Sequence, residues 1–388
     1  MMPDAMLPPP RAACLIIADI SGYTSYLAAA ELDHAQDILA DLMDTVVGAF
    51  RPSFKLAKLE GDAAFVFAVT EGVDGSVLQD TVEGCYFAFQ RRRRDIRQAT
   101  TCPCQACVRI PTLDLKIIAH HGLIAEQRMA GRAELVGRDV IVVHRLLKND
   151  IEAELGVAAY AAYTDACLAA MGVDDPAAIG LREHTETYEA IGDVRVWVHD
   201  LAEAWRRHQD RTEVVIDEAH TGWSIAGEVP GPPSLVWSFL TAPQHRLSWQ
   251  AGITGLDQRT TAGRRGVGTV SHCQHGKDTI IEEILDWRPP HHQTIRIQLP
   301  EPGLPKMTYM QLIEPVGDDR TRVTMRVLRP RTRKDQEATA IAWQIVEPAI
   351  RAGTQALEGL LREEVQRLAA DDTVVAPAPV DSAVAHSS

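Results

Sequence analysis

The chain has 388 residues, of which 46% are hydrophobic and 24% are charged. This length corresponds to two domains or three, and the composition is that of a folded protein with a sizeable core, which excludes wholesale disorder and fibrous repeats. Asp and Glu outnumber Lys and Arg by 53 to 39, so the net charge is −14. Because an acidic protein repels phosphate backbones, we expect no nucleic-acid partner.

The seven cysteines are an odd number and lack the spacing of a disulfide framework. This pattern is typical of a reducing compartment, and we expect a cytoplasmic protein. No apolar run reaches the roughly 18 residues of a membrane-spanning helix. The apolar run at residues 12–18 ends at Asp19 and lacks the charged start of a signal peptide, so no membrane span is expected.

The two ends of the chain, residues 1–10 and 371–388, are rich in proline or small residues and show no helical or strand periodicity, which predicts disorder. Between them, a charged stretch at residues 203–221 separates two blocks of different pattern and predicts a linker. The sequence therefore predicts one domain over residues 11–202 and a second domain over residues 222–370.

The first predicted domain interleaves strands and helices, which indicates an α/β or α+β fold. Its first strand is an apolar run that ends directly before Asp19. A later helix carries a basic run at residues 91–94, and this run indicates a solvated helix face or an internal salt-bridge site. The predicted elements, in chain order, are a strand at 14–18, a helix at 28–50, two strands around a turn at 60–62 within 54–69, the helix through 91–94, a strand at 113–119, a helix at 139–148 and a strand at 194–198.

Two acids in this domain stand at informative positions. Asp19 ends a buried strand and precedes the turn Gly22-Tyr23-Thr24, whereas Asp62 lies at the tip of the predicted hairpin. Two carboxylates that meet across adjacent strands suit a pair of divalent cations, and the backbone N–H groups at the start of a helix suit phosphates. The alternative is that Asp19 caps the following helix and Asp62 is an ordinary turn residue.

Four segments, at residues 18–24, 55–68, 115–122 and 137–146, occur in the order and spacing of the class III adenylate and guanylate cyclase catalytic domain. Residues 12–200 resemble that family. The resemblance implies a ferredoxin-like α+β fold, a homodimer with composite sites, and an ATP-like nucleotide. It also implies Mg²⁺ or Mn²⁺ at Asp19 and Asp62, with the triphosphate cradled by Gly22, Tyr23 and Thr24.

The same resemblance assigns base reading to Lys58, which is typical of adenylate cyclases, with Glu134 as its partner acid. It assigns stabilisation of the transition state to Arg145. The sequence departs from the family at Ile141, where an asparagine is expected, and no lysine occupies residues 188–193. Since one missing donor costs on the order of 100-fold in rate, two functions stay open: an adenylate-cyclase-like signalling enzyme that forms cyclic AMP, and a catalytically inactive cyclase-like sensor.

Three cysteines, Cys102, Cys104 and Cys107, form a compact cluster before the strand at 113–119. Thiolates at this spacing can hold zinc, and the alternatives are a redox pair or free structural thiols. A zinc ion needs a fourth ligand from elsewhere, for which the candidates are Cys85, His120 and His121.

The second predicted domain contains one early helix, a meander of strands and a long closing helix, which indicates an α+β unit. Its strands are predicted at residues 223–229, 266–274, 279–287, 293–299, 307–314 and 321–328. The early helix is predicted to start at residues 232–233, and the closing helix is predicted to span residues 336–369.

Residues 220–370 resemble the START-like helix-grip family, often labelled polyketide cyclase or SRPBCC, on segment 226–229, Trp249 and the strand that ends at 288–289. The resemblance implies a curved sheet around the closing helix and an apolar cavity for a lipid or another hydrophobic small molecule. We expect its occupancy to alter nucleotide binding in the first domain. The candidate wall residues, which alternatively serve as ordinary core, are Trp249, Met307, Tyr309, Met310 and Trp343.

Overall fold

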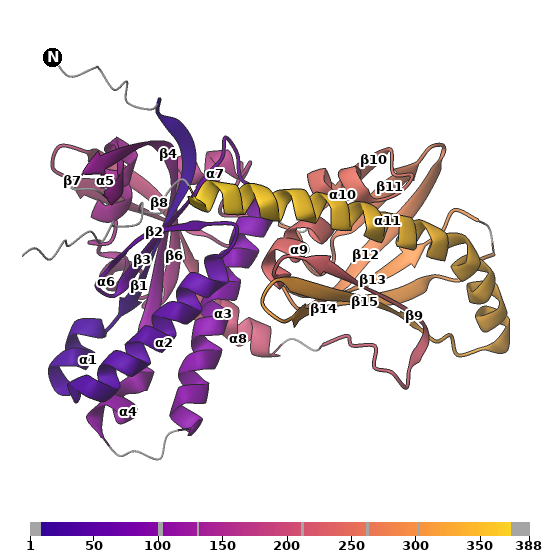
Figure 1. The fold of residues 1–388 in the computed structure, drawn as a ribbon, viewed down its shortest axis with the longest axis horizontal. Coiled ribbons are helices and arrows are strands. Elements are labelled where there is room, and N and C mark those ends of the chain that lie inside the picture. Colours follow the sequence, from indigo (N-terminus) through magenta and orange to yellow (C-terminus); the bar gives the residue numbers. More distant parts are fainter. Residues whose placement is uncertain are drawn as a thin grey trace, which may run out of the picture.

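The computed structural model describes residues 9–99, 104–129, 132–210, 213–260, 264–301 and 303–373. These residues form two sheets, each with its own helices, that lie side by side along the long axis of the molecule (Figure 1). Both units combine sheets of mainly antiparallel strands with helices, so the predicted α+β class is confirmed. The ends that the sequence predicts to be disordered lie largely outside the described residues.

The N-terminal sheet is built around one buried strand, β1 (Arg11–Ser21). Its two neighbours, β3 (Ala63–Val69) and β4 (Asp114–Met129), are antiparallel to it, and β2 (Lys55–Glu60) pairs with β3. The order β2-β3-β1-β4, with helices between β1 and β2 and between β3 and β4, is the ferredoxin-like arrangement. The predicted ferredoxin-like fold is therefore confirmed.

Beyond β4, the sheet continues with a parallel strand and an antiparallel hairpin, and a short strand pairs with the far end of β4. These strands are β6 (Tyr160–Thr164), β8 (Gly192–Asp200), β7 (Arg182–Tyr188) and β5 (Arg132–Val136). The helices of this unit are α1 (Tyr23–Ala29), α2 (Leu32–Phe50), α3 (Gly75–Ala99), α4 (Gln105–Arg109), the 3-10 turn η1 (Ile110–Thr112), α5 (Arg138–Arg145), α6 (Ile151–Leu155), α7 (Asp165–Ala170) and α8 (Leu201–Asp210).

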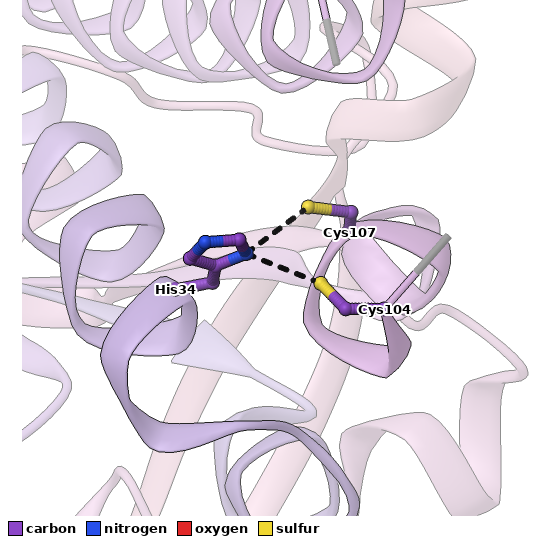
Figure 2. A group of neighbouring side chains, drawn as sticks. All are labelled: His34, Cys104 and Cys107. Atoms are coloured by element: carbon purple, nitrogen blue, oxygen red, sulfur yellow. Dashed lines mark hydrogen bonds between the residues drawn. The ribbon is translucent and has the colours of Figure 1, made fainter. Parts of the chain in front are cut away.

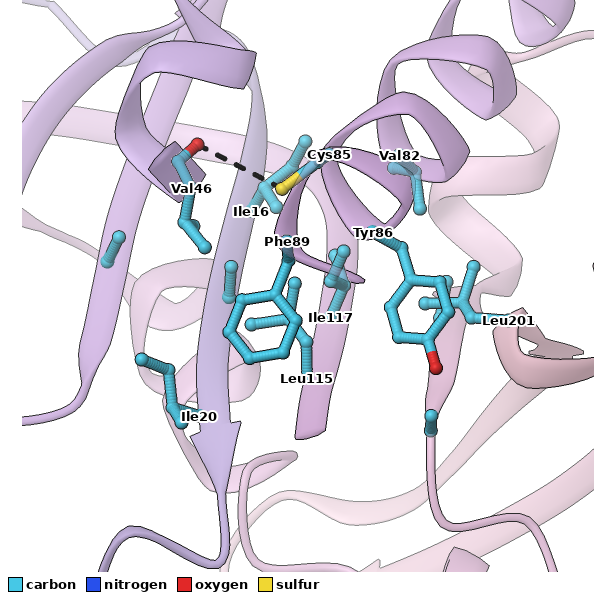
Figure 3. Packing of buried hydrophobic residues seen from close by; sticks show 14 of the residues in the cluster. Ile16, Ile20, Val46, Val82, Cys85, Tyr86, Phe89, Leu115, Ile117 and Leu201 are labelled. Carbon is cyan, nitrogen blue, oxygen red and sulfur yellow. Dashed lines mark hydrogen bonds between the residues drawn. The ribbon is translucent and has the colours of Figure 1, made fainter. Parts of the chain in front are cut away.

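Apolar side chains on both faces of β1 explain why this strand is central. Ile16 packs with Val46 of α2 and Phe89 of α3 on one face, as Figure 3 shows. Leu15, one residue earlier, packs on the other face with Val143 of α5. Because alternate residues of a strand face opposite sides, a continuous apolar run at the start of the chain produces a strand that is covered on both sides.

The predicted helix at residues 28–50 is two helices in the structure. The chain is extended at Ala30 and Glu31, between α1 and α2. No proline or glycine marks this break, and its physical reason is tertiary: the carboxylate of Glu31 accepts a hydrogen bond from the backbone N–H of Ala106 at 3.1 Å. The predicted strand at 113–119 is likewise longer than expected, because β4 extends to Met129 to pair with β5.

The C-terminal sheet is a seven-stranded antiparallel meander that is closed by the first strand of the unit. In sheet order its strands are β10 (Gly255–Arg259), β11 (Val270–His275), β12 (Asp278–Arg288), β13 (His292–Gln298), β14 (Met307–Val316), β15 (Arg320–Leu328) and β9 (Thr221–Pro230). Two short helices, α9 (Pro233–Thr241) and α10 (Pro243–Trp249), precede the meander, and the long helix α11 (Arg333–Thr373) follows it. This arrangement confirms the predicted helix-grip fold.

Helix α8 occupies residues 201–210 and overlaps the first part of the segment predicted as a linker. Its Trp205 packs against Phe87 of α3, with ring centroids 5.2 Å apart, so α8 rests on the N-terminal unit. Helix α11 runs back across the molecule, and its C-terminal end reaches the N-terminal unit (Figure 1). Among the described helices, none combines the length and the apolar character needed to cross a membrane.

Candidate functional site

The two acids predicted as metal ligands lie at the same edge of the N-terminal sheet. Asp19 of β1 is opposite Ala63 of β3, the residue that directly follows Asp62. The backbone N–H of Ile20 donates to the carbonyl of Asp62 at 3.0 Å. The pairing of β1 with β3 therefore brings Asp19 and Asp62 together, as expected from a strand end beside a hairpin tip.

The surroundings of Asp19 disfavour its charged form. Burial, and next the nearby charge of Asp62, raise the pKa of Asp19 from 3.8 to about 6, although Lys116 acts in the opposite direction. Burial also raises the pKa of Asp62. Two acids crowded at a partly buried edge are typical of a site that binds cations, because a bound cation offsets both the burial and the mutual repulsion.

The turn after β1 contains a glycine, Gly22, with a left-handed backbone conformation. Gly22 has a φ of 84° and is the residue before α1, which begins at Tyr23. A Cβ atom at Gly22 would lie 2.7 Å from the carbonyl oxygen of Thr112, so any larger residue would be strained and would clash. Tyr23 is half-buried and Thr24 is exposed at the start of α1. The hydroxyl of Ser21, by contrast, is buried without a hydrogen-bond partner among the described residues.

The residues predicted to read the base also meet. The ammonium of Lys58 on β2 lies 3.7 Å from Glu134 on β5 and 2.7 Å from Glu60. Glu60 in turn lies 3.0 Å from Nε2 of His144 on α5. Lys58 and Glu134 border a small pocket of about 40 Å³ whose inner wall includes Phe65.

The position predicted for stabilising the transition state is at the end of α5. Arg145 is the last residue of α5 and its side chain is exposed. Ile141, one turn earlier, exposes 55% of its surface, although it is a large apolar residue. The structure thus provides two groups of side chains. The first consists of Asp19 and Asp62, at the edge formed by β1 and β3. The second consists of Lys58, Glu134 and Arg145, on β2, β5 and α5.

The cysteine cluster is only partly described. Cys102 lies outside the described residues, whereas Cys104 directly precedes α4 and Cys107 lies within it. The fourth-ligand candidates lie elsewhere: Cys85 approaches the carbonyl of Val46, and His120 contacts Thr164 and Asp139. His121 contacts the carbonyl of Thr70. The three candidates for the fourth ligand therefore have other partners in the structure, and the cysteine-bearing helix α4 packs against α2.

The basic run on α3 has internal partners. Arg92 forms an ion pair with Asp41 of α2, and the guanidinium of Arg93 donates to the carbonyl of Leu113. These contacts agree with the interpretation of the run as an internal salt-bridge site.

A cavity of about 180 Å³ lies between the C-terminal sheet and α11. Four of the predicted wall residues line it: Trp249, Met307, Tyr309 and Trp343. The prediction for Met310 was wrong, because it stands between Tyr309 and Gln311, which both line the cavity, and alternate residues of β14 face opposite sides.

One part of the cavity wall is polar. The guanidinium of Arg246 makes two bonds to the carboxylate of Glu282, at 2.8 and 3.0 Å, and both side chains are buried. Nε2 of His275 is buried without a hydrogen-bond partner among the described residues, and His275 also lines the cavity. A bound molecule can therefore place an apolar body against the sheet and a polar group near Arg246 and His275.

The two units are joined by partly buried ion pairs that the sequence did not reveal. Arg264 contacts Glu83 of α3 at 2.6 Å and Asp80 at 3.0 Å, and Arg265 contacts Asp74 at 2.6 Å. We call these five residues the interdomain clasp. Burial is the largest influence on the pKa of Glu83 and raises it, but the charges and hydrogen bonds of Arg264 and His199 together outweigh burial and leave that pKa well below its usual range.

Two tryptophans of the C-terminal unit form hydrogen bonds with one residue of the clasp. The indole N–H groups of Trp237 and Trp287 donate to Asp80 at 3.3 and 3.2 Å, and Asp80 is only 4% exposed. Arg264 and Arg265 are more than 180 residues away in the sequence from the acids that they contact, so no local pattern could have predicted the clasp.

Two family models match different parts of the chain. Residues 39–155 match the family described as "Protein of unknown function (DUF2652)", and residues 224–370 match the family "Polyketide cyclase / dehydrase and lipid transport". The uncharacterized protein Rv2561/Rv2562 of Mycobacterium tuberculosis is 32% identical over 231 residues, which are 59% of this chain and 95% of that protein.

Solved structures that match part of this chain include two cyclases. The guanylyl cyclase Cya2 has a TM-score of 0.37 at 14% identity, covering 50% of this chain and 93% of its own. The adenylyl cyclase CyaB from P. aeruginosa has a TM-score of 0.36 at 15% identity, covering 50% of this chain and 95% of its own. Protein Ms6760 from Mycobacterium smegmatis has a TM-score of 0.31 at 16% identity, covering 39% and 96%.

Proposed function

The chain belongs to the family of the mycobacterial protein Rv2561/Rv2562, and from this premise and the geometry of its carboxylate pair we propose that it is an adenylate-cyclase-like signalling protein. It binds an ATP-like nucleotide with Mg²⁺ or Mn²⁺ and forms cyclic AMP, under the control of a hydrophobic ligand in the C-terminal unit. The observation that carries the proposal is the meeting of Asp19 and Asp62 at one sheet edge, where the pKa of Asp19 is raised to about 6.

The residues at this edge fit a divalent cation. Carboxylate oxygens are the ligands that Mg²⁺ and Mn²⁺ prefer. The buried, unpartnered hydroxyl of Ser21 adds an oxygen donor next to the same strand end. Lys116 offsets part of the charge of Asp19, but its ammonium also pairs with Glu152 at 3.4 Å, so the carboxylate pair is not neutralised by it alone. When bound, the ions would balance the charge of the triphosphate and lower the pKa of the ribose hydroxyl.

Side chains of the second group suit an adenine. The ammonium of Lys58 can donate to a ring nitrogen, and the carboxylate of Glu134 can accept from the exocyclic amino group. A guanine would present a carbonyl oxygen to Glu134 instead, which the carboxylate repels. Arg145 is exposed at the end of α5, where it can meet the charge that develops on a triphosphate.

The two groups act together across a homodimer in this proposal. Lys58, Glu134 and Arg145 of one chain would face Asp19 and Asp62 of the other chain. Exposed apolar side chains on or beside these elements support a protein interface: Leu59 on β2 exposes 54% of its surface, and Leu123 on β4, the strand that pairs with β5, exposes 56%.

The ligand of the C-terminal unit is amphipathic in this proposal. The cavity walls are mainly aliphatic and aromatic, whereas Arg246, Glu282 and His275 provide one polar region. The matched family for residues 224–370 is described by lipid transport, which agrees with a hydrophobic occupant.

Helix α11 provides a route from this cavity to the nucleotide site. Its residues Trp343 and Leu357 line the cavity, and its residue Leu368 borders a cleft that also contains Lys55 of β2. Lys58 lies on the same strand as Lys55. A ligand that shifts α11 would therefore change the contacts beside the base-reading strand.

A second function rests on one specific observation. Ile141 places an exposed apolar side chain where the family resemblance implies an asparagine that orients the ribose. A protein with this change can bind nucleotide and metal without turnover, which would make it a nucleotide-binding sensor.

The test is to incubate the purified full chain with ATP or GTP and Mn²⁺ and to separate the products by chromatography. Cyclic AMP from ATP, with little cyclic GMP from GTP, is the expected result, and Asp19→Asn should abolish it while Asp44→Asn, an exposed control on α2, should not. Binding without any cyclic product would select the sensor, and no binding would contradict both functions.

A further inference from the structure

The contact between α4 and α2 brings together three side chains that bind metals in other proteins. His34 lies near the start of α2. About seventy residues later in the chain, Cys104 directly precedes α4 and Cys107 lies in the middle of this short helix. Figure 2 shows the imidazole of His34 facing both thiols. Their ligand atoms, one nitrogen and two sulfurs, all lie within 4.8 Å of one another.

The spacing of these atoms matches a tetrahedral ion. Nδ1 of His34 lies 3.3 Å from Sγ of Cys104 and 4.0 Å from Sγ of Cys107. With Zn–S bonds of about 2.3 Å and Zn–N bonds of about 2.0–2.1 Å, tetrahedral geometry separates a sulfur from a nitrogen by about 3.6 Å. The two observed distances lie on either side of this value, so shifts of a few tenths of an ångström would close the site around an ion.

Other contacts hold α4 in this position independently of the three ligands. The hydroxyl of Tyr26 donates to the carbonyl of Ala106 at 2.9 Å, and the backbone N–H of Ala106 donates to Glu31 at 3.1 Å. Ala106 lies between the two cysteines in sequence. The pair of thiols is thus presented to His34 by the packing of the helices, which is the preorganisation that a metal site requires.

We propose that His34, Cys104 and Cys107 bind a zinc ion that fastens α4 to α2. Two thiolates and an imidazole are a ligand set typical of structural zinc, and carboxylate-preferring ions such as Mg²⁺ are not expected there. Three protein ligands leave one position for a fourth donor.

The same atoms have a competing use. Hydrogen bonding to Cys104 raises the pKa of His34. Without a metal, Cys104 and Cys107 form instead a reactive pair that an oxidant can convert to a disulfide. Metal and disulfide exclude each other, because a thiolate ligand cannot also be bonded to a second sulfur.

A zinc ion here would also fix the wall of the turn at Gly22. The segment that follows α4 ends at Thr112, whose carbonyl oxygen would lie 2.7 Å from a Cβ atom at Gly22. Fastening α4 to α2 therefore restrains the backbone against which the turn at residues 22–24 rests.

The experiment measures the metal content of the full chain, purified without chelator under reducing conditions. About one zinc per chain is expected in the wild type and in Gln36→Ala, an exposed control on the same helix, whereas His34→Ala and Cys104→Ser should lose most of it. Replacement of zinc by Co²⁺ should give thiolate-to-cobalt charge-transfer absorption in the wild type, and that absorption should be weakened by His34→Ala.

Three results would overturn the proposal. The first is protein that contains no zinc as purified and also takes up none from added ZnCl₂. The second is His34→Ala with the zinc content and the cobalt spectrum of the wild type. The third is a Cys104–Cys107 disulfide, detected by mass spectrometry, in protein that was kept anaerobic throughout. His34 is exposed, so its substitution should not prevent folding, and circular dichroism verifies this.

Discussion

At the scale of single residues, Asp19 is the group whose environment departs furthest from that of an ordinary acid in the N-terminal site. Its pKa of about 6 lies above the usual 3.8, so the folded chain holds the proton more tightly than the unfolded chain does. Stability contributed by this group is therefore present at low pH and lost as the pH rises from about 4 to about 6. A cation that binds the ionised acid reverses that loss.

This reasoning predicts opposite effects of Asp19→Asn with and without metal. At pH 7.5 and without metal, the variant should unfold at a higher temperature than the wild type, because it removes a poorly solvated charge. Mn²⁺ should stabilise the wild type, increasingly as the pH rises through 6, and should not stabilise the variant. Thermal unfolding at pH 5 and pH 7.5 measures both effects.

Asp44→Asn on α2 is the matched control, since Asp44 is exposed and away from the sheet edge. It should respond to Mn²⁺ as the wild type does. Equal stabilisation of Asp19→Asn and of the wild type by Mn²⁺ would show that the cations bind elsewhere.

A second prediction concerns Lys58, which is shared between Glu60 and Glu134. Lys58→Met removes a charged hydrogen-bond donor worth about 1.5–3 kcal/mol, so the dissociation constant for ATP with Mn²⁺ should rise on the order of tenfold to a hundredfold. Glu60→Gln should instead strengthen ATP binding, because it releases Lys58 from its closest partner. Calorimetric titration measures both, and unchanged affinity in Lys58→Met would refute its role in reading the base.

The sequence predicted some of these residues and not others for a physical reason. Asp19 and Asp62 could be placed together because a strand end and a hairpin tip are local features whose pairing follows from the fold. His34 could not be assigned to the cysteines, because it is separated from Cys104 by about seventy residues and the contact arises from helix packing.

At the scale of elements, the cavity depends on the inward face of β15. Val323 and Met325 line the cavity and are only half-buried, although they lie on a central strand of the sheet. An apolar ligand that covers these half-buried side chains removes apolar surface from water, which makes its binding more favourable.

We therefore predict that Val323→Phe, which fills part of the cavity, weakens binding of an apolar fluorescent probe such as 1-anilinonaphthalene-8-sulfonate at least several-fold. It should keep the circular dichroism spectrum of the wild type. Thr324→Phe, on the opposite face of the same strand, is the control and should bind the probe as the wild type does. Loss of binding in both variants, or in neither, would contradict the assignment of the cavity as the binding site.

Element positions were predictable where periodicity is strong, as for β1, the β2–β3 hairpin and β12 to β15. The break between α1 and α2 was not, because its cause is the contact of Glu31 with the distant Ala106. β6 was missed as well: residues 160–164 are buried and form a short strand between two others, with no alternation to indicate it.

At the scale of the whole molecule, the clasp and α11 tie the two units together. Arg264 pairs with both Asp80 and Glu83, of which Asp80 is buried and Glu83 is half-buried. Removing one partner of a buried ion pair leaves an uncompensated charge, at a cost of about 3–5 kcal/mol.

Arg264→Ala should accordingly lower the free energy of unfolding by about 3 kcal/mol in urea titrations. Arg259→Ala, whose side chain is 76% exposed, should have almost no effect. Arg264→Ala should also reduce the influence of a cavity ligand on ATP binding, because the two units then move more independently. A variant as stable and as strongly coupled as the wild type would show that the clasp has no part in either.

The central claim is that Asp19 and Asp62 together hold the cations for a bound nucleotide. It is tested most directly by calorimetric titration of ATP into the full chain with Mn²⁺, in the wild type, Asp62→Asn and the double variant Asp19→Asn/Asp62→Asn. The account predicts saturable binding that requires Mn²⁺ in the wild type and is lost in both variants. Binding of equal strength in the wild type and the double variant, or no binding by the wild type, would contradict it.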